Sequence, residues 1–329
     1  MTYTTANTDW LALCRYGLAV HWTAKTMPRR GEPLPFQKAV EAFNLDAFVD
    51  GVIESGADYV FFTCTHALQM MPAPNPVIDR ILPGRTSERD LIGEIATRLA
   101  AHRKHFMFYY NHSCNQADDP EWEMAVGYHA QPKERFASNL CEIVSWMGRH
   151  YGESVRAWWF DSSYSLDPRG PNNSVTTDLA GFHFPWERMT EAAKEGFGQR
   201  LVTYNAGVNE TFLYTTHQDY WAGEMVALSN PAKARYLENG LQWHGLTYLD
   251  DRTWIHSQRD TDAADLLYAD DELFSFVREC NLHQAPVCFN VSIYQDGTMS
   301  SKAIKQLKNL GARLPGRNNP VFGGILAWK

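Results

Sequence analysis

Val155-Arg-Ala-Trp-Trp-Phe-Asp161 is the stretch of sequence that indicates the fold most clearly. Four apolar residues after Arg156 are typical of a short buried strand, and a single carboxylate follows at its end. The chain repeats this pattern. Eight short apolar runs, most of them separated by helix-like stretches, each end in a polar or ionisable residue: Gly17–His21, Asp58–Cys64 followed by His66, His105–His112, Val155–Asp161, Leu201–Asn205, Gln218–Glu224, Leu241–His244 and Pro286–Asn290.

This alternation predicts an α/β fold, a single (β/α)8 TIM-like barrel. The intervening helices are expected at Ala47–Ser55, Leu91–Lys104, Lys133–Tyr151, Pro185–Gly196 and Ser300–Ala312, with Asn44 or Asp46 capping the first. Such a barrel takes about 250 residues, so we expect residues 1–329 to form a single catalytic domain. The tail, residues 314–329, has no clear place in it.

The C-terminal ends of the strands in such a barrel face one shared active site. The residues that end the runs are therefore also the candidate site residues: His21, His66, His112, Asp161, Asn205, Glu224, His244 and Asn290.

Composition excludes several classes of partner. The formal net charge is −8, which argues against nucleic acid or an anionic membrane surface as the main partner. No apolar run reaches the roughly 18 residues that span a bilayer, and the first residues lack the features of a secretory signal. We therefore expect a cytoplasmic protein, and the sequence leaves a homo-oligomer open. The six cysteines show no CxxC spacing and are expected to be buried free thiols rather than disulfides or a zinc site.

Asp161 is the residue at which the chemistry is most sharply indicated. A carboxylate at a strand end can serve as a glycosidase nucleophile, a metal ligand or a substrate clamp. The structural alternative is a helix cap or a salt bridge in a loop.

Five segments, in order along the chain, resemble motifs of the family 29 α-L-fucosidases. Gly17–Trp22 resembles the family's G-L-F-I-H-W-G, and Gly56–His66 its G-A-K-Y-V-V-L-T-x-K-H-H. Phe108–Asn111 resembles a G-x-Y-Y-S strand, and Asn290–Gly297 resembles L-N-V-G-P-x-x-D-G. Trp159-Phe-Asp161 is similar to W-F-D-G, which carries the nucleophilic aspartate. The resemblance covers residues 17 to about 310, the catalytic barrel.

The chain departs from these motifs at three positions. Thr23 and Ser162 stand where the family has glycine, and Ala67 stands where it has the second of two paired histidines. The C-terminal β-sandwich common in the family has no room in this sequence, so the chain is expected to be a divergent member without it.

The resemblance implies a retaining glycosidase that cleaves a terminal α-L-fucosyl or related sugar and needs no cofactor and no metal. Retention requires a second carboxyl group as general acid. Glu224 and Glu238 compete for this role, and Glu224 is favoured because a strand end positions a side chain more precisely than a loop.

The remaining candidates would bind substrate. The resemblance implies that His21 and His66 contact sugar hydroxyls. Aromatic side chains at the site could form walls for the sugar, or could pack beneath it. The other candidate substrate-binding residues are Trp22, Tyr110, Asn111, His112, Trp159, Asn205, Trp221, Trp243, His244 and Asn290.

Two other functions remain open at this point. A metal-dependent barrel enzyme would draw its ligands from His66, His112, Asp161, Glu224 and His244, although HxH and HExxH spacings are absent. A carbohydrate-binding barrel that has lost catalysis would account for the departures at Ala67 and Ser162.

Overall fold

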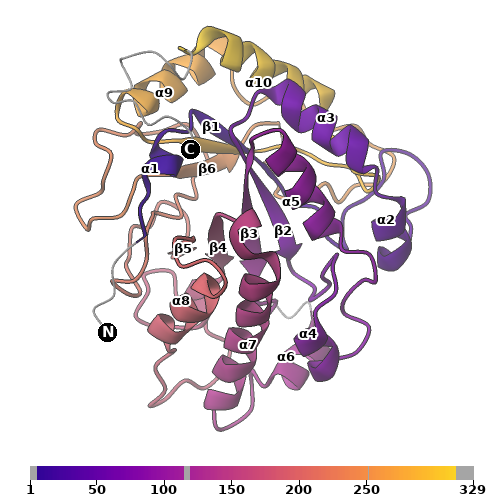
Figure 1. The fold of residues 1–329 in the computed structure, drawn as a ribbon, viewed down its shortest axis with the longest axis vertical. Helices are drawn as coiled ribbons and strands as arrows, with labels where there is room; N and C mark the ends of the chain where they lie inside the picture. Colours follow the sequence, from indigo (N-terminus) through magenta and orange to yellow (C-terminus); the bar gives the residue numbers. More distant parts are fainter. Residues whose placement is uncertain (1–5, 115–118, 251, 316–329) are drawn as a thin grey trace.

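The computed structural model describes residues 6–114, 119–250 and 252–315, and these form an α/β fold around one curled, open parallel sheet (Figure 1). Seven strands lie in the order β5-β4-β3-β2-β1-β7-β6. Their bounds are β1 Tyr16–Val20, β2 Tyr59–Thr65, β3 His105–Asn111, β4 Ala157–Asp161, β5 Leu201–Tyr204, β6 Gly245–Tyr248 and β7 Val287–Asn290.

Helices cover the convex face of this sheet (Figure 1). The five predicted helices are present within a few residues of their expected bounds, and Asn44, not Asp46, caps the first by accepting the Ala47 N–H at 3.0 Å. The long helix α9 was not predicted. The helices are α1 Asp9–Ala12, α2 Phe36–Ala42, α3 Leu45–Ser55, α4 Pro76–Ile81, α5 Leu91–Ala101, α6 Pro120–Val126, α7 Glu134–Tyr151, α8 Trp186–Lys194, α9 Asp270–Leu282 and α10 Ser301–Arg313, with short 3₁₀ turns η1 Gly152–Ser154 and η2 Ser163–Ser165.

The predicted strand Gln218–Glu224 is not a strand. The segment lies between β5 and β6 but forms no continuous ladder: it has isolated bridges from Tyr220 to Gln242 and from Glu224 to Leu246, and single hydrogen bonds to β5 such as Asp219 N to the Val202 carbonyl. Gly223 explains the irregularity, because its φ of +68° is left-handed and interrupts an extended backbone. The structure therefore shows a seven-stranded sheet, and the predicted closed barrel of eight strands is not confirmed.

The predicted strand Leu241–His244 is displaced along the chain. Regular pairing begins only at Gly245, opposite Val287 of β7, so the strand is β6. The residues before Gly245 face the irregular segment, which offers single hydrogen bonds rather than a ladder. His244 therefore precedes a strand instead of ending one.

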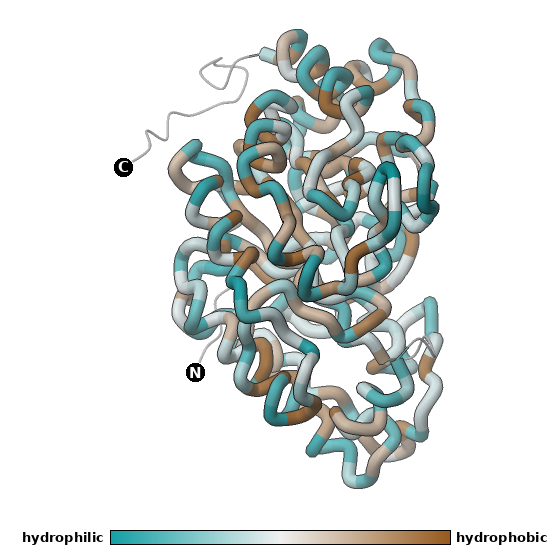
Figure 2. Tube along the Cα trace, turned by 90° about the vertical axis from the view of Figure 1, so that its right-hand side faces the viewer, coloured by the Kyte–Doolittle hydropathy of each residue, from teal (hydrophilic) through white to brown (hydrophobic). Residues whose placement is uncertain are grey.

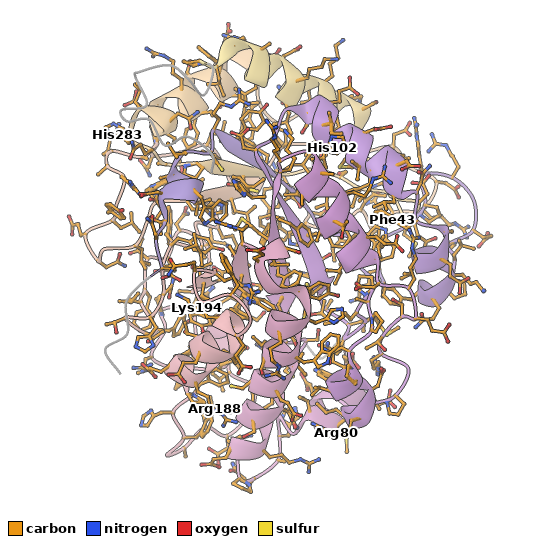
Figure 3. All side chains as sticks on the ribbon, viewed as in Figure 1. Phe43, Arg80, His102, Arg188, Lys194 and His283 are labelled. Atoms are coloured by element: carbon orange, nitrogen blue, oxygen red, sulfur yellow. The ribbon has the colours of Figure 1, made fainter. Side chains whose placement is uncertain are left out.

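A buried ion pair fixes the irregular segment to the helical layer. Lys194 at the end of α8, labelled in Figure 3, lies 2.8 Å from the Asp219 carboxylate. The same carboxylate accepts the backbone N–H of Val202 in β5 and of Ala6 near the N-terminus. Asp219 thus joins three parts of the chain beneath the C-terminal ends of the strands.

Two apolar layers form the core. One lies between the sheet and its helices, and the other fills the inside of the curl, where Phe61, Met107 and Trp159 meet Leu11 and Cys14 from the N-terminal segment. Hydrophilic residues are spread over the outer turns (Figure 2). All six cysteines lie within the described residues, are buried and form no disulfide, as predicted. None of the helices described combines the length and the apolar character that crossing a bilayer requires.

Arg200 is a buried cation with no carboxylate partner among the interactions described. Its guanidinium donates to five backbone carbonyls that lie mainly at the C-terminal ends of α7 and α8: Gly148, Gly152, Val155, Ala193 and Glu195. Helix C-termini carry partial negative charge, which stabilises a cation there. Burial nevertheless lowers the pKa of Arg200 to about 10.

We expect Arg200→Met to lower the free energy of unfolding by ~3 kcal/mol or more, because it leaves these carbonyls buried without donors. Urea unfolding followed by circular dichroism measures the change. Arg188→Met is the matched control on α8, since Arg188 is exposed (Figure 3), and it should stay within ~0.5 kcal/mol of the parent. Equal losses in the two variants would contradict the role given to Arg200.

Candidate active site

Strand alternation places one set of polar side chains inside the curl at the C-terminal edge of the sheet. Along a strand, residues two apart share a face. Asp161 therefore shares the inner face with Trp159, and Asn111 shares it with Tyr109, both of which belong to or adjoin the inner apolar layer. The polar residues sit directly above that layer, where buried apolar packing ends.

Asp161 is held by donors on both carboxylate oxygens. Oδ2 accepts from the Tyr109 hydroxyl at 2.5 Å and from Asn111 Nδ2 at 3.0 Å, and Oδ1 accepts from Asn205 Nδ2 at 3.0 Å. Burial opposes ionisation, but the adjacent His66 and these donors outweigh it, so the pKa of Asp161 lies below its usual range. The site therefore contains an ionised, oriented carboxylate.

Glu224 lies beside this carboxylate in the opposite electrostatic situation. Its Oε2 accepts from the same nitrogen, Asn205 Nδ2, at 2.7 Å. Burial and the negative charge of Asp161 raise the pKa of Glu224 to about 7, although the hydrogen bond from Asn205 opposes the shift. Two neighbouring carboxyl groups whose pKa values are pushed apart are suited to act as nucleophile and acid.

Gly223 allows Glu224 to reach this position. The backbone there passes so close to β6 that a Cβ would lie 1.9 Å from the His244 carbonyl oxygen. On either side of this contact, Leu246 N donates to the Gly223 carbonyl and Met225 N to the Leu246 carbonyl. The glutamate is thus seated by a close backbone approach rather than by a strand end.

A second part of the site is made of aromatic and imidazole rings. His21 Nδ1 lies 2.7 Å from Asn290 Oδ1, and Asn290 Nδ2 donates to the Trp254 carbonyl. The His21 ring lies 5.4 Å from that of His66 and 5.1 Å from that of Trp254, between centroids. Burial and the nearby His66 lower the pKa of His21 to about 3, so its ring is an uncharged hydrogen-bonding group.

The structure brings together seven of the residues predicted from the sequence and one that supports them. The seven are His21, His66, Asn111, Asp161, Asn205, Glu224 and Asn290. Trp159 lies one layer below, stacked on Tyr109 at 5.3 Å, with its Nε1 donating to the Ala222 carbonyl.

Three other predicted residues point to the helical side of the sheet. Trp22 packs against Phe36 and Phe43. Tyr110 packs against Trp158 and Phe160. The remaining one, His112, is bonded through Nε2 to the Ser162 carbonyl and to the Ser165 hydroxyl.

Four more predicted residues lie away from the two carboxylates. Trp221 and Trp243 pack edge to face at 5.6 Å. His244 lies below the site, with its ring against those of Tyr59 and Tyr220. Glu238 is exposed, in the turn that the Gly240 N–H closes onto Leu237.

Sequence reasoning missed three residues at the site: Tyr109, Tyr164 and Trp254. Tyr109 could have been found, because it shares a face with Asn111 whereas Tyr110 faces the other way. Tyr164 follows β4 in η2, and the charge of Asp161 together with burial raises its pKa above the usual range. Trp254 lies in an irregular loop after β6, where no periodic signal exists.

Ser162 shows why one departure from the fucosidase motif is tolerated. Its φ is +56°, a left-handed conformation in which glycine is the least strained residue. The serine hydroxyl accepts from Asn111 Nδ2 at 3.0 Å and so adds a contact that glycine would lack. Ala67, at the missing histidine, is also left-handed, with a φ of +63°.

The ligand set considered for a metal enzyme is not assembled, since His112 Nε2 is bonded to the Ser162 carbonyl and the Ser165 hydroxyl, and His244 lies against Tyr59 and Tyr220. Over residues 6–114, 119–250 and 252–315, no three His, Cys, Asp or Glu side chains are grouped so as to hold a metal ion.

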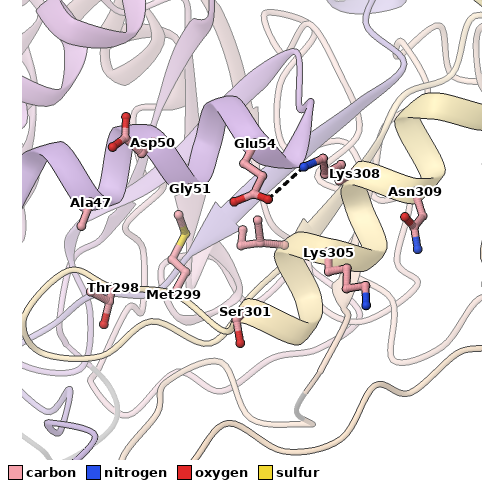
Figure 4. Close-up of a pocket in the computed structure, with 11 residues that line it drawn as sticks. Ala47, Asp50, Gly51, Glu54, Thr298, Met299, Ser301, Lys305, Lys308 and Asn309 are labelled. Atoms are coloured by element: carbon pink, nitrogen blue, oxygen red, sulfur yellow. Dashed lines mark hydrogen bonds and ion pairs between the residues drawn. The ribbon is translucent and has the colours of Figure 1, made fainter.

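A separate groove of about 590 Å³ lies on the outer helical layer between α3 and α10 (Figure 4). Four of its eleven lining residues are charged, and two of these, Glu54 and Lys308, form an ion pair at 3.1 Å. It shares no residue with the carboxylate site.

Comparisons with known proteins bear on the family and the fold. The model of the alpha-L-fucosidase family matches residues 33–318. No curated protein matches the chain.

Solved structures share the fold at low sequence identity. An endo-fucoidan hydrolase of glycoside hydrolase family 107 aligns with TM-score 0.67 and 11% identity, over 98% of this chain and 97% of that one. Alpha-L-fucosidase isoenzyme 1 from Paenibacillus thiaminolyticus aligns with TM-score 0.65 and 17% identity, over 93% and 74%. Alpha-L-fucosidase AlfC from Lactobacillus casei, in complex with alpha-L-fucose, aligns with TM-score 0.62 and 13% identity, over 93% and 98%. At these identities the likeness supports the fold alone, whereas the family model spans most of the sequence and assigns it: the chain belongs to the alpha-L-fucosidase family.

Proposed function

We propose that this protein is a retaining glycoside hydrolase that cleaves a terminal α-L-fucosyl group or a closely related sugar. Asp161 is the nucleophile and Glu224 the general acid and base. The observation that best supports this pair is their shared hydrogen-bond donor, because Asp161 Oδ1 and Glu224 Oε2 both lie within 3.0 Å of Asn205 Nδ2. The two oxygens therefore cannot be more than about 6 Å apart, which suits retaining enzymes (roughly 5–5.5 Å) better than inverting ones (roughly 6.5–9.5 Å).

The first half-reaction uses both carboxyl groups in their resting states. Asp161, ionised, attacks the anomeric carbon and forms a glycosyl ester. Glu224, protonated, gives its proton to the glycosidic oxygen, which leaves with the bonding electron pair. The lowered pKa of Asp161 and the raised pKa of Glu224 favour these states.

The second half-reaction reverses the roles. Glu224, now a carboxylate, takes a proton from water, and the resulting oxygen attacks the anomeric carbon and displaces Asp161. The sugar is released with its original anomeric configuration, and both carboxyl groups return to their starting protonation.

The sugar identity rests on the family and on the ring-lined part of the site around His21. The solved fucosidases that share the fold include one bound to alpha-L-fucose. His66 and Trp254 both lie against the His21 ring, and together the three offer ring nitrogens and an aromatic face, which suits hydroxyl groups on one side of a sugar and C–H groups on the other. The glycosidic substrate is the expected partner.

The test is turnover of aryl glycosides by the whole chain. We expect aryl α-L-fucoside to be hydrolysed faster than its α-L-galacto and β-D-arabino counterparts, with the α-anomer of fucose appearing first in time-resolved proton NMR. First appearance of the β-anomer would instead establish inversion. Binding of fucose with no turnover of any glycoside would make this a carbohydrate-binding barrel.

A further inference from the structure

We propose that Asn205 is a positioning residue, not a sugar ligand: its amide fixes the spacing of Asp161 and Glu224 and divides one NH₂ group between them. The inference rests on the proposed function, since it gives Asn205 a part in the reaction of that pair. The sequence alone suggested substrate binding for this residue, because it ends a strand.

All polar atoms of the Asn205 side chain are already committed. An amide NH₂ carries two hydrogens, and the two carboxylates accept them at 3.0 and 2.7 Å. The amide oxygen accepts the Gly207 N–H at 3.0 Å, which fixes which end of the amide faces the carboxylates. The Asn205 backbone N–H donates to the Phe160 carbonyl, which ties the residue to the strand that carries Asp161. No donor is left for a sugar hydroxyl.

This arrangement serves both half-reactions without movement. At rest Asp161 carries the charge and Glu224 the proton. When the glycosyl ester forms, the charge passes to Glu224. Because one N–H points at each carboxyl group throughout, Asn205 stabilises whichever of them is ionised and holds them at one separation.

The test compares two substitutions that remove different donors. Asn205→Leu keeps the volume but removes both N–H groups, whereas Tyr109→Phe removes only a donor to Asp161. Activity against pH should be bell-shaped, rising as Asp161 ionises and falling as Glu224 loses its proton. Hydrogen bonds from Asn205 lower the pKa of both groups, so their loss should raise both.

We therefore expect Asn205→Leu to move both limbs of the kcat/KM profile to higher pH by about one unit, the size of a hydrogen bond to a charged group. Tyr109→Phe should move only the rising limb. At the optimum, kcat of Asn205→Leu should fall by ~10²-fold through lost alignment, with KM little changed.

Three results for Asn205→Leu would overturn the inference. They are a kcat/KM–pH profile whose limbs stay in place while kcat falls, a raised KM with a normal kcat, and a shift of only one limb of the profile. If Asn205→Leu does not fold, as judged by circular dichroism, Asn205→Ser replaces it. The carboxyl pKa values are also read by carbon-13 NMR of labelled Asp and Glu, which needs no turnover. An inactive parent would thus reject the proposed function, while the paired NMR shifts would still decide the role of Asn205.

Discussion

Asp161→Asn is expected to lower kcat by ~10⁴-fold or more while leaving the fold and sugar binding intact. The amide has nearly the shape of the carboxylate but cannot form the glycosyl ester. Stopped assays with an aryl α-L-fucoside measure the rate, and calorimetric titration with fucose measures the binding.

Asp167→Asn is the matched control for the loss of a buried carboxylate. Asp167 pairs with Arg169 and accepts from Trp186 Nε1, so its substitution should affect stability more than rate. A near-normal kcat for Asp161→Asn would reject its assignment as the nucleophile.

Glu224→Ala should separate substrates by their leaving groups. A good aryl leaving group needs little protonation, so formation of the glycosyl ester should survive, whereas a substrate with a poor leaving group should lose ~10²–10⁴-fold in kcat/KM. Hydrolysis of the ester lacks its base in this variant. Added azide, which needs no deprotonation, should restore turnover of the activated substrate and yield a fucosyl azide of retained configuration.

Glu238→Ala provides the control, because Glu238 is exposed and lies in a turn. It should keep parent activity on both kinds of substrate. Azide rescue in Glu238→Ala but not in Glu224→Ala would transfer the acid role to Glu238. Rescue in neither would argue against a two-carboxylate mechanism.

The fold could be predicted where local patterns determine it. Continuous apolar runs such as Tyr59–Thr65 are strands because both faces are buried, and the sequence shows this directly. The segment Gln218–Glu224 looks equally strand-like, but Gly223 takes a left-handed conformation that only the approach of β6 explains. A contact between distant segments leaves no periodic trace in either one.

The site residues also separate into those that a local sequence pattern indicates and those that only the tertiary structure reveals. The residues that end regular strands, among them Asp161 and Asn290, were identified because a parallel sheet gathers its C-terminal ends. Residue type alone does not distinguish Tyr109 from Tyr110, whereas the two-residue alternation of a strand places Tyr109, and not Tyr110, on the face of the carboxylates. Trp254 comes from a loop and was inaccessible to this reasoning.

The two carboxylates lie on backbone of different regularity, and this difference affects how their positions can change in evolution. Asp161 ends β4, which pairs with β3 on one side and β5 on the other. Glu224 instead belongs to residues 205–244, a stretch with neither helix nor regular strand. An insertion or deletion in that stretch would relocate the proposed acid while leaving the proposed nucleophile in place. Relatives built this way should keep the aspartate at the same position of the strand and supply the second carboxyl group from different positions in the chain. A change in the position of that second group would therefore alter which leaving groups are accepted before it altered which sugar is bound.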